Sequence, residues 1–185
     1  MDAIARKPLG FGEQRLRINL HSVASQTPAG LRLGIHPVRV ADYLEPHPAE
    51  LIHSCAIQLI SPLRLKEQGS IIKNYAPSLS SLLGHIKRRL ALLVLFWVDE
   101  NPLWQSYLKL PVLVGDHQLL DSPVYFEDWL RYSGSRKELL PFGGLLGEIC
   151  YQGDIYKALA WLEVGELLQI GGKTTFGLGS YRLLV

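Results

Sequence analysis

The sequence of 185 residues predicts an α+β fold in which an antiparallel sheet carries two helices on one face. Short stretches in which apolar and polar residues alternate are typical of half-buried strands. Two other stretches repeat apolar residues at three- and four-residue steps, as amphipathic helices do. These elements follow one another in the order β-α-β-β-α-β, which is the split βαβ, or ferredoxin-like, arrangement.

The first strand and the first helix are expected between residues 51 and 97. In residues 51–60 the apolar side chains alternate, and Ser61-Pro62 is expected to end the strand. Ser78 is placed to cap a helix with a continuous apolar face. Its most apolar part, residues 90–98, holds nine residues, whereas a membrane span needs about twenty. We therefore expect a buried helix and no membrane partner.

The remaining elements are expected after residue 123. Residues 124–133 and 144–152 resemble two strands joined by a long hairpin connection. Asp154 is expected to cap the second helix and Gly165 to end it. Two strand-like segments, residues 167–170 and 181–185, flank a glycine-rich loop. The last segment completes the expected order of elements.

A domain boundary is expected near residue 48. Residues 38–48 contain Glu45-Pro-His-Pro48, which interrupts regular structure and indicates a linker. The segment Gly10-Phe-Gly-Glu-Gln-Arg-Leu16 also matches Gly177-Leu-Gly-Ser-Tyr-Arg-Leu183 at both glycines, the arginine and the leucine. We therefore predict that residues 1–48 are the remnant of an N-terminal ferredoxin-like domain with a linker. Residues 49–185 are predicted to form the C-terminal ferredoxin-like domain.

Composition and charge exclude several classes of protein. With 48% apolar and 19% charged residues, the chain is not expected to be disordered. The net charge of +2 means that any polyanion must be bound by a local patch. Cys55 and Cys150 are too few for a disulfide framework and lack the spacing of a zinc site. We therefore expect a reducing, cytoplasmic setting and no metal. Residues 1–9 also lack the apolar segment of a secretory signal.

The glycine-rich loop is the strongest functional motif. It has four glycines in nine positions, from Gly171 to Gly179, and Lys173, Thr174 and Thr175 lie between them. Backbone amides without side-chain obstruction, together with a lysine and hydroxyl groups, form a plausible phosphate cradle. A Walker loop is disfavoured because position 167 is leucine rather than glycine. A flexible hairpin turn remains the simpler alternative.

These residues resemble the CRISPR-associated precursor-RNA processing endoribonucleases of the RAMP (repeat-associated mysterious protein) superfamily. The glycine loop fits their form Gly-x5-Gly-hydrophobic-Gly. The other matching segments are Ser61-Pro-Leu-Arg-Leu-Lys66, Arg88-Arg-Leu90, Trp129-Leu-Arg-Tyr-Ser133 and Gly143-Gly-Leu-Leu-Gly147. The resemblance covers about residues 50–185, and residues 9–23 through the internal match alone. Such proteins typically carry two ferredoxin-like domains, so we expect nearly all of the first domain to be missing here.

The resemblance implies a metal-independent endoribonuclease that needs no cofactor. The RNA 2′-hydroxyl would attack the adjacent phosphate and leave a cyclic phosphate and a 5′-hydroxyl. This reaction requires a general base with a near-neutral pKa and cations near the phosphate. In many relatives the base is a histidine of the first domain, which favours His36 and His21 as catalytic candidates. His85 lies near Arg88 and Arg89 on the first expected helix.

The expected RNA-binding residues are cationic or belong to the glycine loop. They are Gly171, Gly172, Lys173, Thr174, Thr175, Phe176, Gly177, Gly179, Arg64, Lys66, Arg131, Arg136 and Lys137. The expected partners are CRISPR repeat RNA and other CRISPR-associated proteins, in antiviral defence. Two alternatives stay open. One is a catalytically inactive crRNA-binding or scaffold subunit of an effector complex, and the other is a ferredoxin-like protein-interaction domain without an RNA role.

Overall fold

The computed structural model describes residues 9–11, 16–18, 21–27, 29–37, 39, 52–97 and 114–185. The chain divides into two compact units, Met1–Tyr43 and Leu44–Val185. The expected linker, residues 38–48, lies outside the described residues except for Arg39. That residues 1–48 are the remnant of an N-terminal ferredoxin-like domain with a linker stays a prediction.

The described residues of the first unit form two antiparallel hairpins. β1 (Leu9–Phe11) pairs with β2 (Leu16–Ile18), and β3 (Ala24–Thr27) pairs with β4 (Gly30–Leu33). The second hairpin turns at Gly30, whose φ of +100° suits glycine. The Thr27 hydroxyl supports this turn by donating a hydrogen bond to the Gly30 carbonyl over 2.8 Å.

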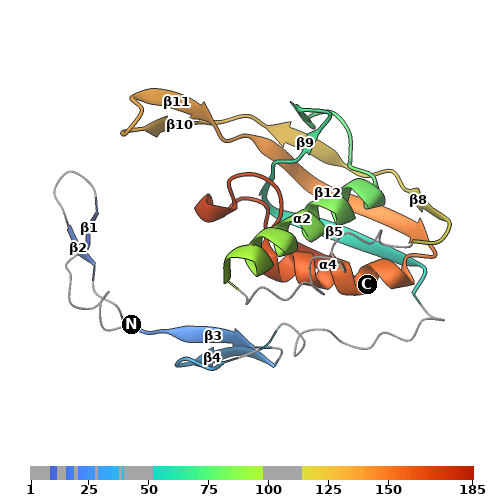
Figure 1. The fold of residues 1–185 in the computed structure, drawn as a ribbon, viewed down its shortest axis with the longest axis horizontal. Coiled ribbons are helices and arrows are strands. Elements are labelled where there is room, and N and C mark those ends of the chain that lie inside the picture. Colours follow the sequence, from blue (N-terminus) through green and yellow to red (C-terminus); the bar gives the residue numbers. More distant parts are fainter. Residues whose placement is uncertain are drawn as a thin grey trace. The chain divides into compact units, whose positions relative to one another are not determined.

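The second unit is built on an antiparallel sheet that confirms the predicted fold (Figure 1). β13 (Tyr181–Leu184) pairs with β5 (Ser54–Leu63), and β5 pairs with β12 (Gly144–Gly153). Two short strands, β8 (His117–Leu119) and β9 (Val124–Glu127), share the other edge of β12. This is the strand order of a ferredoxin-like sheet in which one hairpin strand is divided in two.

Two helices, α2 (Leu79–Trp97) and α4 (Tyr156–Leu168), pack against the sheet and enclose the core. Apolar side chains that alternate along β5 and β12 meet the apolar faces of the helices, as the sequence pattern predicts. The expectation that residues 90–98 are buried is wrong in part, because Leu92, Leu95 and Phe96 at the end of α2 are exposed. The hydroxyl groups of two core tyrosines are hydrogen-bonded to backbone carbonyls. The Tyr151 hydroxyl donates to the Pro77 carbonyl over 2.8 Å, and the Tyr181 hydroxyl donates to the Leu162 carbonyl. Among the described residues, none of the helices has the length and apolar character to cross a membrane.

Three predicted element boundaries are wrong. β5 continues through Pro62 to Leu63 because β13 pairs with β5 only as far as Leu59, so the missing proline N–H breaks no ladder there. α4 starts at Tyr156 without a side-chain cap from Asp154. It continues past Gly165, which is buried where a Cβ atom would lie 2.7 Å from Ile86 Cδ1. Gly165 thus permits close packing rather than ending the helix, and residues 167–170 form no strand.

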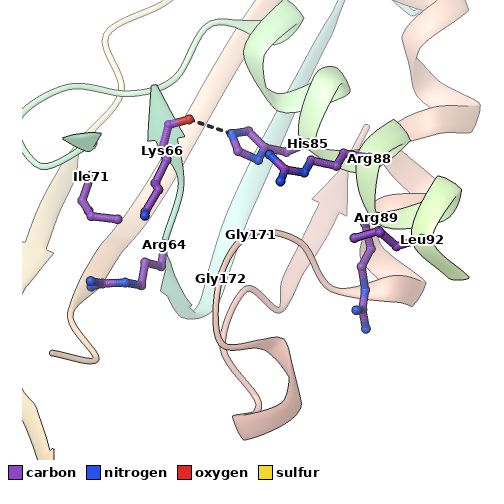
Figure 2. A pocket seen from close by; sticks show the side chains of 9 residues that line it. All are labelled: Arg64, Lys66, Ile71, His85, Arg88, Arg89, Leu92, Gly171 and Gly172. Atoms are coloured by element: carbon purple, nitrogen blue, oxygen red, sulfur yellow. Dashed lines mark hydrogen bonds between the residues drawn. The ribbon is translucent and has the colours of Figure 1, made fainter. Parts of the chain in front are cut away.

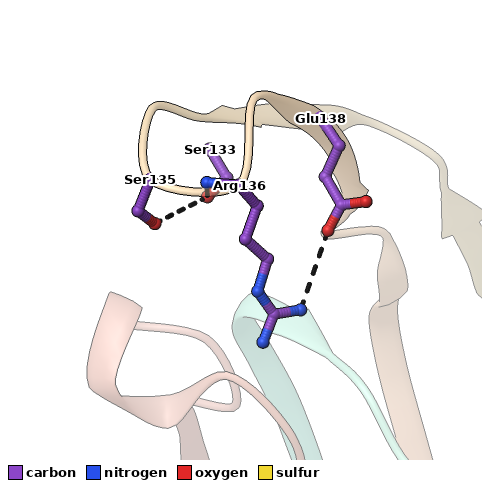
Figure 3. A network of polar contacts seen from close by, with 4 residues as sticks. All are labelled: Ser133, Ser135, Arg136 and Glu138. Carbon is purple, nitrogen blue, oxygen red and sulfur yellow. Dashed lines mark hydrogen bonds and ion pairs between the residues drawn. The ribbon is translucent and has the colours of Figure 1, made fainter.

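The predicted long connection between two strands is itself a hairpin. Residues 124–133 divide into β9 and β10 (Leu130–Ser133), and β10 pairs with β11 (Glu138–Pro141) (Figure 1). The turn between them is stabilised by Ser133, whose Oγ accepts the Arg136 N–H over 3.3 Å (Figure 3). Across the same turn, Arg136 Nη1 lies 3.7 Å from Glu138 Oε1.

Candidate nucleic-acid interface

The glycine loop connects α4 to β13 and follows a tightly constrained path. A short 3-10 turn, η2 (Thr174–Phe176), lies at its centre. Gly171 and Gly179 have φ values of +87° and +79°. A Cβ atom on Gly171 would lie 2.6 Å from the Arg64 carbonyl oxygen, and one on Gly179 would overlap the carbonyl of Ile170. Both positions therefore require glycine for backbone conformation and for space.

Four amides of the loop donate to carbonyls of the protein itself, so they are not the solvent-facing amides expected of a phosphate cradle. The N–H of Gly172 donates to the Arg64 carbonyl over 2.8 Å, and that of Gly179 donates to the Pro62 carbonyl over 3.1 Å. Within the loop, the amides of Phe176 and Gly177 donate to Lys173 and Thr174, each over 2.9 Å. These amides are used in docking the loop onto the end of β5 and in forming η2.

Docking the loop in this way closes one side of a basic pocket of ≈ 280 Å³ (Figure 2). The end of β5, the short hairpin of β6 (Lys66–Glu67) with β7 (Ser70–Ile71), α2 and the glycine loop all contribute to it. Its lining residues are Arg64, Lys66, Ile71, His85, Arg88, Arg89, Leu92, Gly171 and Gly172. No acidic side chain is among these lining residues in the described part of the chain. The pocket therefore concentrates positive charge although the whole chain is nearly neutral.

Two of the pocket arginines are held by carbonyl oxygens rather than carboxylates. Arg64 Nη1 donates to the Gly143 carbonyl over 2.7 Å, and Arg89 Nε donates to the Leu168 carbonyl over 3.4 Å. A carbonyl orients a guanidinium group without cancelling its charge. The pocket is therefore prepared to bind an anion such as a phosphodiester, for which arginine is well suited.

His85 lines the same pocket one helical turn before Arg88 and Arg89. Its Nε2 lies 3.2 Å from the Lys66 carbonyl oxygen, so Nε2 carries the hydrogen and donates it. Burial lowers the pKa of His85 most, and the nearby Arg88 lowers it further. The hydrogen bond to Lys66 and the charge of Glu67 oppose this shift. The ring is therefore neutral at pH 7, with Nδ1 as its acceptor.

Aromatic and cationic side chains form a second cluster beside the loop. The Arg131 guanidinium carbon lies 4.6 Å from the ring centre of Phe176, and Lys173 Nζ lies 4.8 Å from that of Phe142. Phe142 is buried and meets Phe176 edge to face, with 5.1 Å between ring centres. Phe176 itself is 52% exposed. Cation–π contacts of this kind hold the cations near the loop.

The structure brings together only part of the predicted site. Arg64, Lys66, Gly171 and Gly172 share the pocket, while Lys173, Phe176 and Arg131 share the aromatic cluster. Thr174 and Thr175 lie in η2. By contrast, Arg136 and Lys137 lie in the β10–β11 turn and do not line the pocket.

The two histidines predicted to be catalytic lie in the first unit. His21 and His36 are both exposed, and His36 Nε2 lies 2.8 Å from the Leu33 carbonyl oxygen. Their catalytic role stays a prediction. Sequence reasoning gave His85 no role in a site, although the spacing of residues 85, 88 and 89 places all three on one helix face. Among the described residues, no group of three or more histidine, cysteine, aspartate or glutamate side chains is arranged to hold a metal ion.

Comparison with known proteins identifies the family. The family model described as CRISPR-associated endoribonuclease Cas6 matches residues 57–181. The search of curated proteins found no match.

Several solved structures are similar to this chain. The partial Cas6-RT-Cas1–Cas2 complex is 16% identical, with a TM-score of 0.48, over 73% of this chain and 23% of that one. Thermus thermophilus Cas6 is 14% identical, with a TM-score of 0.47, over 71% of this chain and 53% of that one. A Cas6 product complex is 18% identical, with a TM-score of 0.41, over 71% and 51%. This chain thus matches at most 53% of the length of these structures. Because the family model covers more than half of the chain, the protein belongs to the Cas6 family of CRISPR-associated endoribonucleases.

Proposed function

We propose that this chain binds precursor CRISPR RNA and cleaves it without a metal ion, through attack of a ribose 2′-hydroxyl on the adjacent phosphate. The observation that supports this most is the basic pocket, in which four arginine and lysine side chains adjoin the glycine loop. A phosphodiester carries one negative charge that such a pocket attracts. Membership of the Cas6 family makes RNA the polyanion to test first.

The proposed reaction is a transesterification. A general base takes the proton of the 2′-hydroxyl, and the 2′-oxygen forms a bond to phosphorus. The bond from phosphorus to the 5′-oxygen breaks, and that oxygen receives a proton as it leaves. The products are a 2′,3′-cyclic phosphate and a 5′-hydroxyl. Charge that develops on the phosphoryl oxygens is stabilised by fixed cations, a role that we assign to Arg64 and Arg88, which line the pocket.

A pair of synthetic RNAs tests the proposal. One carries the CRISPR repeat of the source organism, and its copy has a 2′-deoxyribose at the scissile position. The full chain with a chelator should bind both RNAs and cut only the first, because the copy lacks the attacking oxygen. The cut should leave a cyclic phosphate. Cleavage of both RNAs would contradict the mechanism.

The same assay separates the alternative functions. If the chain binds both RNAs and cuts neither, it acts as a catalytically inactive crRNA-binding or scaffold subunit, with other CRISPR-associated proteins as partners. If it binds neither RNA, the basic pocket has another role, and a protein-interaction domain becomes the better description.

A further inference from the structure

The pocket contains a titratable side chain in addition to its fixed cations. His85 projects from α2 toward Lys66, beside the Arg88 side chain (Figure 2). Its hydrogen bond to the Lys66 carbonyl fixes the tautomer, because only a protonated Nε2 can donate to that oxygen. The remaining ring nitrogen, Nδ1, carries the lone pair. A nitrogen base thus lies in the same pocket as the cations proposed to bind the phosphate.

We propose that His85 is the general base that removes the proton from the 2′-hydroxyl of the RNA bound in this pocket. The inference rests on the proposed endoribonuclease function and assigns one of its steps to a named atom. Nδ1 accepts the proton as the 2′-oxygen bonds to phosphorus, so the ring ends this step as an imidazolium. The donor bond from Nε2 to Lys66 is kept throughout and holds the ring in place.

The charges around His85 suit this role. The cations that line the pocket come from the end of β5, from β6 and from α2, and they are Arg64, Lys66, Arg88 and Arg89. The opposing charge is Glu67 on β6, whose carboxylate accepts a hydrogen bond from Tyr75 over 3.0 Å. The glycine loop contributes no charged side chain to the lining. In the free protein burial, and after it the charge of Arg88, disfavour a positive charge on His85, which keeps the ring neutral and able to accept a proton.

Binding of RNA changes this balance in the direction that catalysis needs. A phosphodiester in the pocket compensates the cations, and its negative charge stabilises the imidazolium that forms when Nδ1 takes the proton. The base is therefore neutral before the substrate binds and becomes a stronger base beside the bound phosphate. Such a positioned base typically accelerates proton transfer by about 100- to 10,000-fold.

His85→Gln is the informative variant, because its side-chain amide retains a donor for the Lys66 carbonyl but cannot act as a base. Cleavage of the repeat RNA is measured in single turnover with the full chain at saturating concentration. We expect His85→Gln to bind RNA like the wild type and to cleave at least about 100-fold more slowly. The wild-type rate should rise with pH until His85 is deprotonated and then level off. His85→Gln should lack this inflection, and added imidazole should restore part of the activity of His85→Ala.

His117→Ala is the matched control, because His117 lies on β8, is exposed and does not line the pocket. It should cleave like the wild type. Unchanged cleavage by His85→Gln would overturn the inference and leave the proposed function intact. The inference would also be overturned if His21→Ala or His36→Ala lost the pH inflection while His85→Gln kept it. A wild type that binds RNA but does not cut would refute both proposals, and weaker binding with normal saturated cleavage would assign His85 to binding alone.

Discussion

Gly177 and Gly179 show how one backbone conformation can have two different structural reasons. Their φ values are +83° and +79°, which lie in a region that residues other than glycine rarely adopt. A Cβ atom on Gly177 would meet no atom of the described residues within 4 Å, whereas one on Gly179 would overlap the carbonyl of Ile170. The first glycine is needed for conformation only, and the second for conformation and space.

This difference predicts unequal costs of substitution. Gly177→Ala should lower the free energy of unfolding by about 1 kcal/mol, the usual cost of a left-handed alanine. Gly179→Ala should cost at least about 3 kcal/mol, because a backbone carbonyl in its way cannot rotate aside as a side chain would. Urea denaturation followed by circular dichroism measures both values. Equal losses would show that the close approach at Gly179 does not limit the loop.

The two cysteines should differ in reactivity. Burial, reinforced by the nearby Cys150, raises the pKa of Cys55 to about 11. At pH 8 only about one Cys55 thiol in a thousand is then the reactive thiolate. Burial and Glu148 also raise the pKa of Cys150, but its side chain is partly exposed. Iodoacetamide should therefore modify Cys150 first, as peptide mass spectrometry can follow, and urea should remove the difference. Equal rates in the folded protein would contradict this expectation.

At the scale of the elements, the helix ends provide a matched comparison. The Ser81 N–H donates to Ser78 Oγ over 3.2 Å at the start of α2, whereas no side chain caps α4. Ser78→Ala should therefore lower the free energy of unfolding by about 1 kcal/mol. Asp154→Ala, at the position predicted to cap α4, should cost clearly less. Thermal unfolding of both variants checks the order, and a larger loss for Asp154→Ala would reverse the assignment.

Sequence patterns predict the elements that pack one regular face on the core. The apolar repeat of α2 and the alternation in β5 and β12 each indicate the element and its buried face, because one face of each packs on the same core. The β10–β11 hairpin was missed since most of its side chains are exposed, which leaves no alternating pattern. Gly165 looked like a helix end, and only tertiary packing against Ile86 shows why α4 continues.

At the scale of the whole molecule, local charge rather than net charge governs the expected RNA affinity. Binding should weaken as salt rises, with a log–log slope of about −0.7 for each phosphate contact with single-stranded RNA. Arg88→Gln should therefore make the slope less steep by about 0.7. Arg182→Gln is the control, since Arg182 is exposed on β13 next to the buried Tyr181 and does not line the pocket. Fluorescence anisotropy over a salt series measures both. An equal change in the two variants would argue against a defined phosphate site.

The sequence indicates which residues belong to the candidate site better than it indicates how their groups are arranged. The motifs indicated Arg64, Lys66 and the glycine loop, and the fold does place them together. The docking of the loop amides was not predictable, because the amides of Gly172 and Gly179 donate to carbonyls more than a hundred positions away in the sequence. The proposed role of His85 was not predictable either, since it depends on a hydrogen bond to the Lys66 carbonyl across the pocket.

The short stretch from Pro62 to Arg64 has a consequence for how the site is maintained. Its carbonyls accept hydrogen bonds from both ends of the glycine loop. The Arg64 guanidinium also donates to the carbonyl of Gly143, the residue immediately before β12. If the glycine loop came away from residues 62–64, the pocket would therefore lose one of its walls even while α2 and α4 stay folded. The amide protons of Gly172 and Gly179 are natural reporters of this event, and bound RNA should slow their exchange with deuterium.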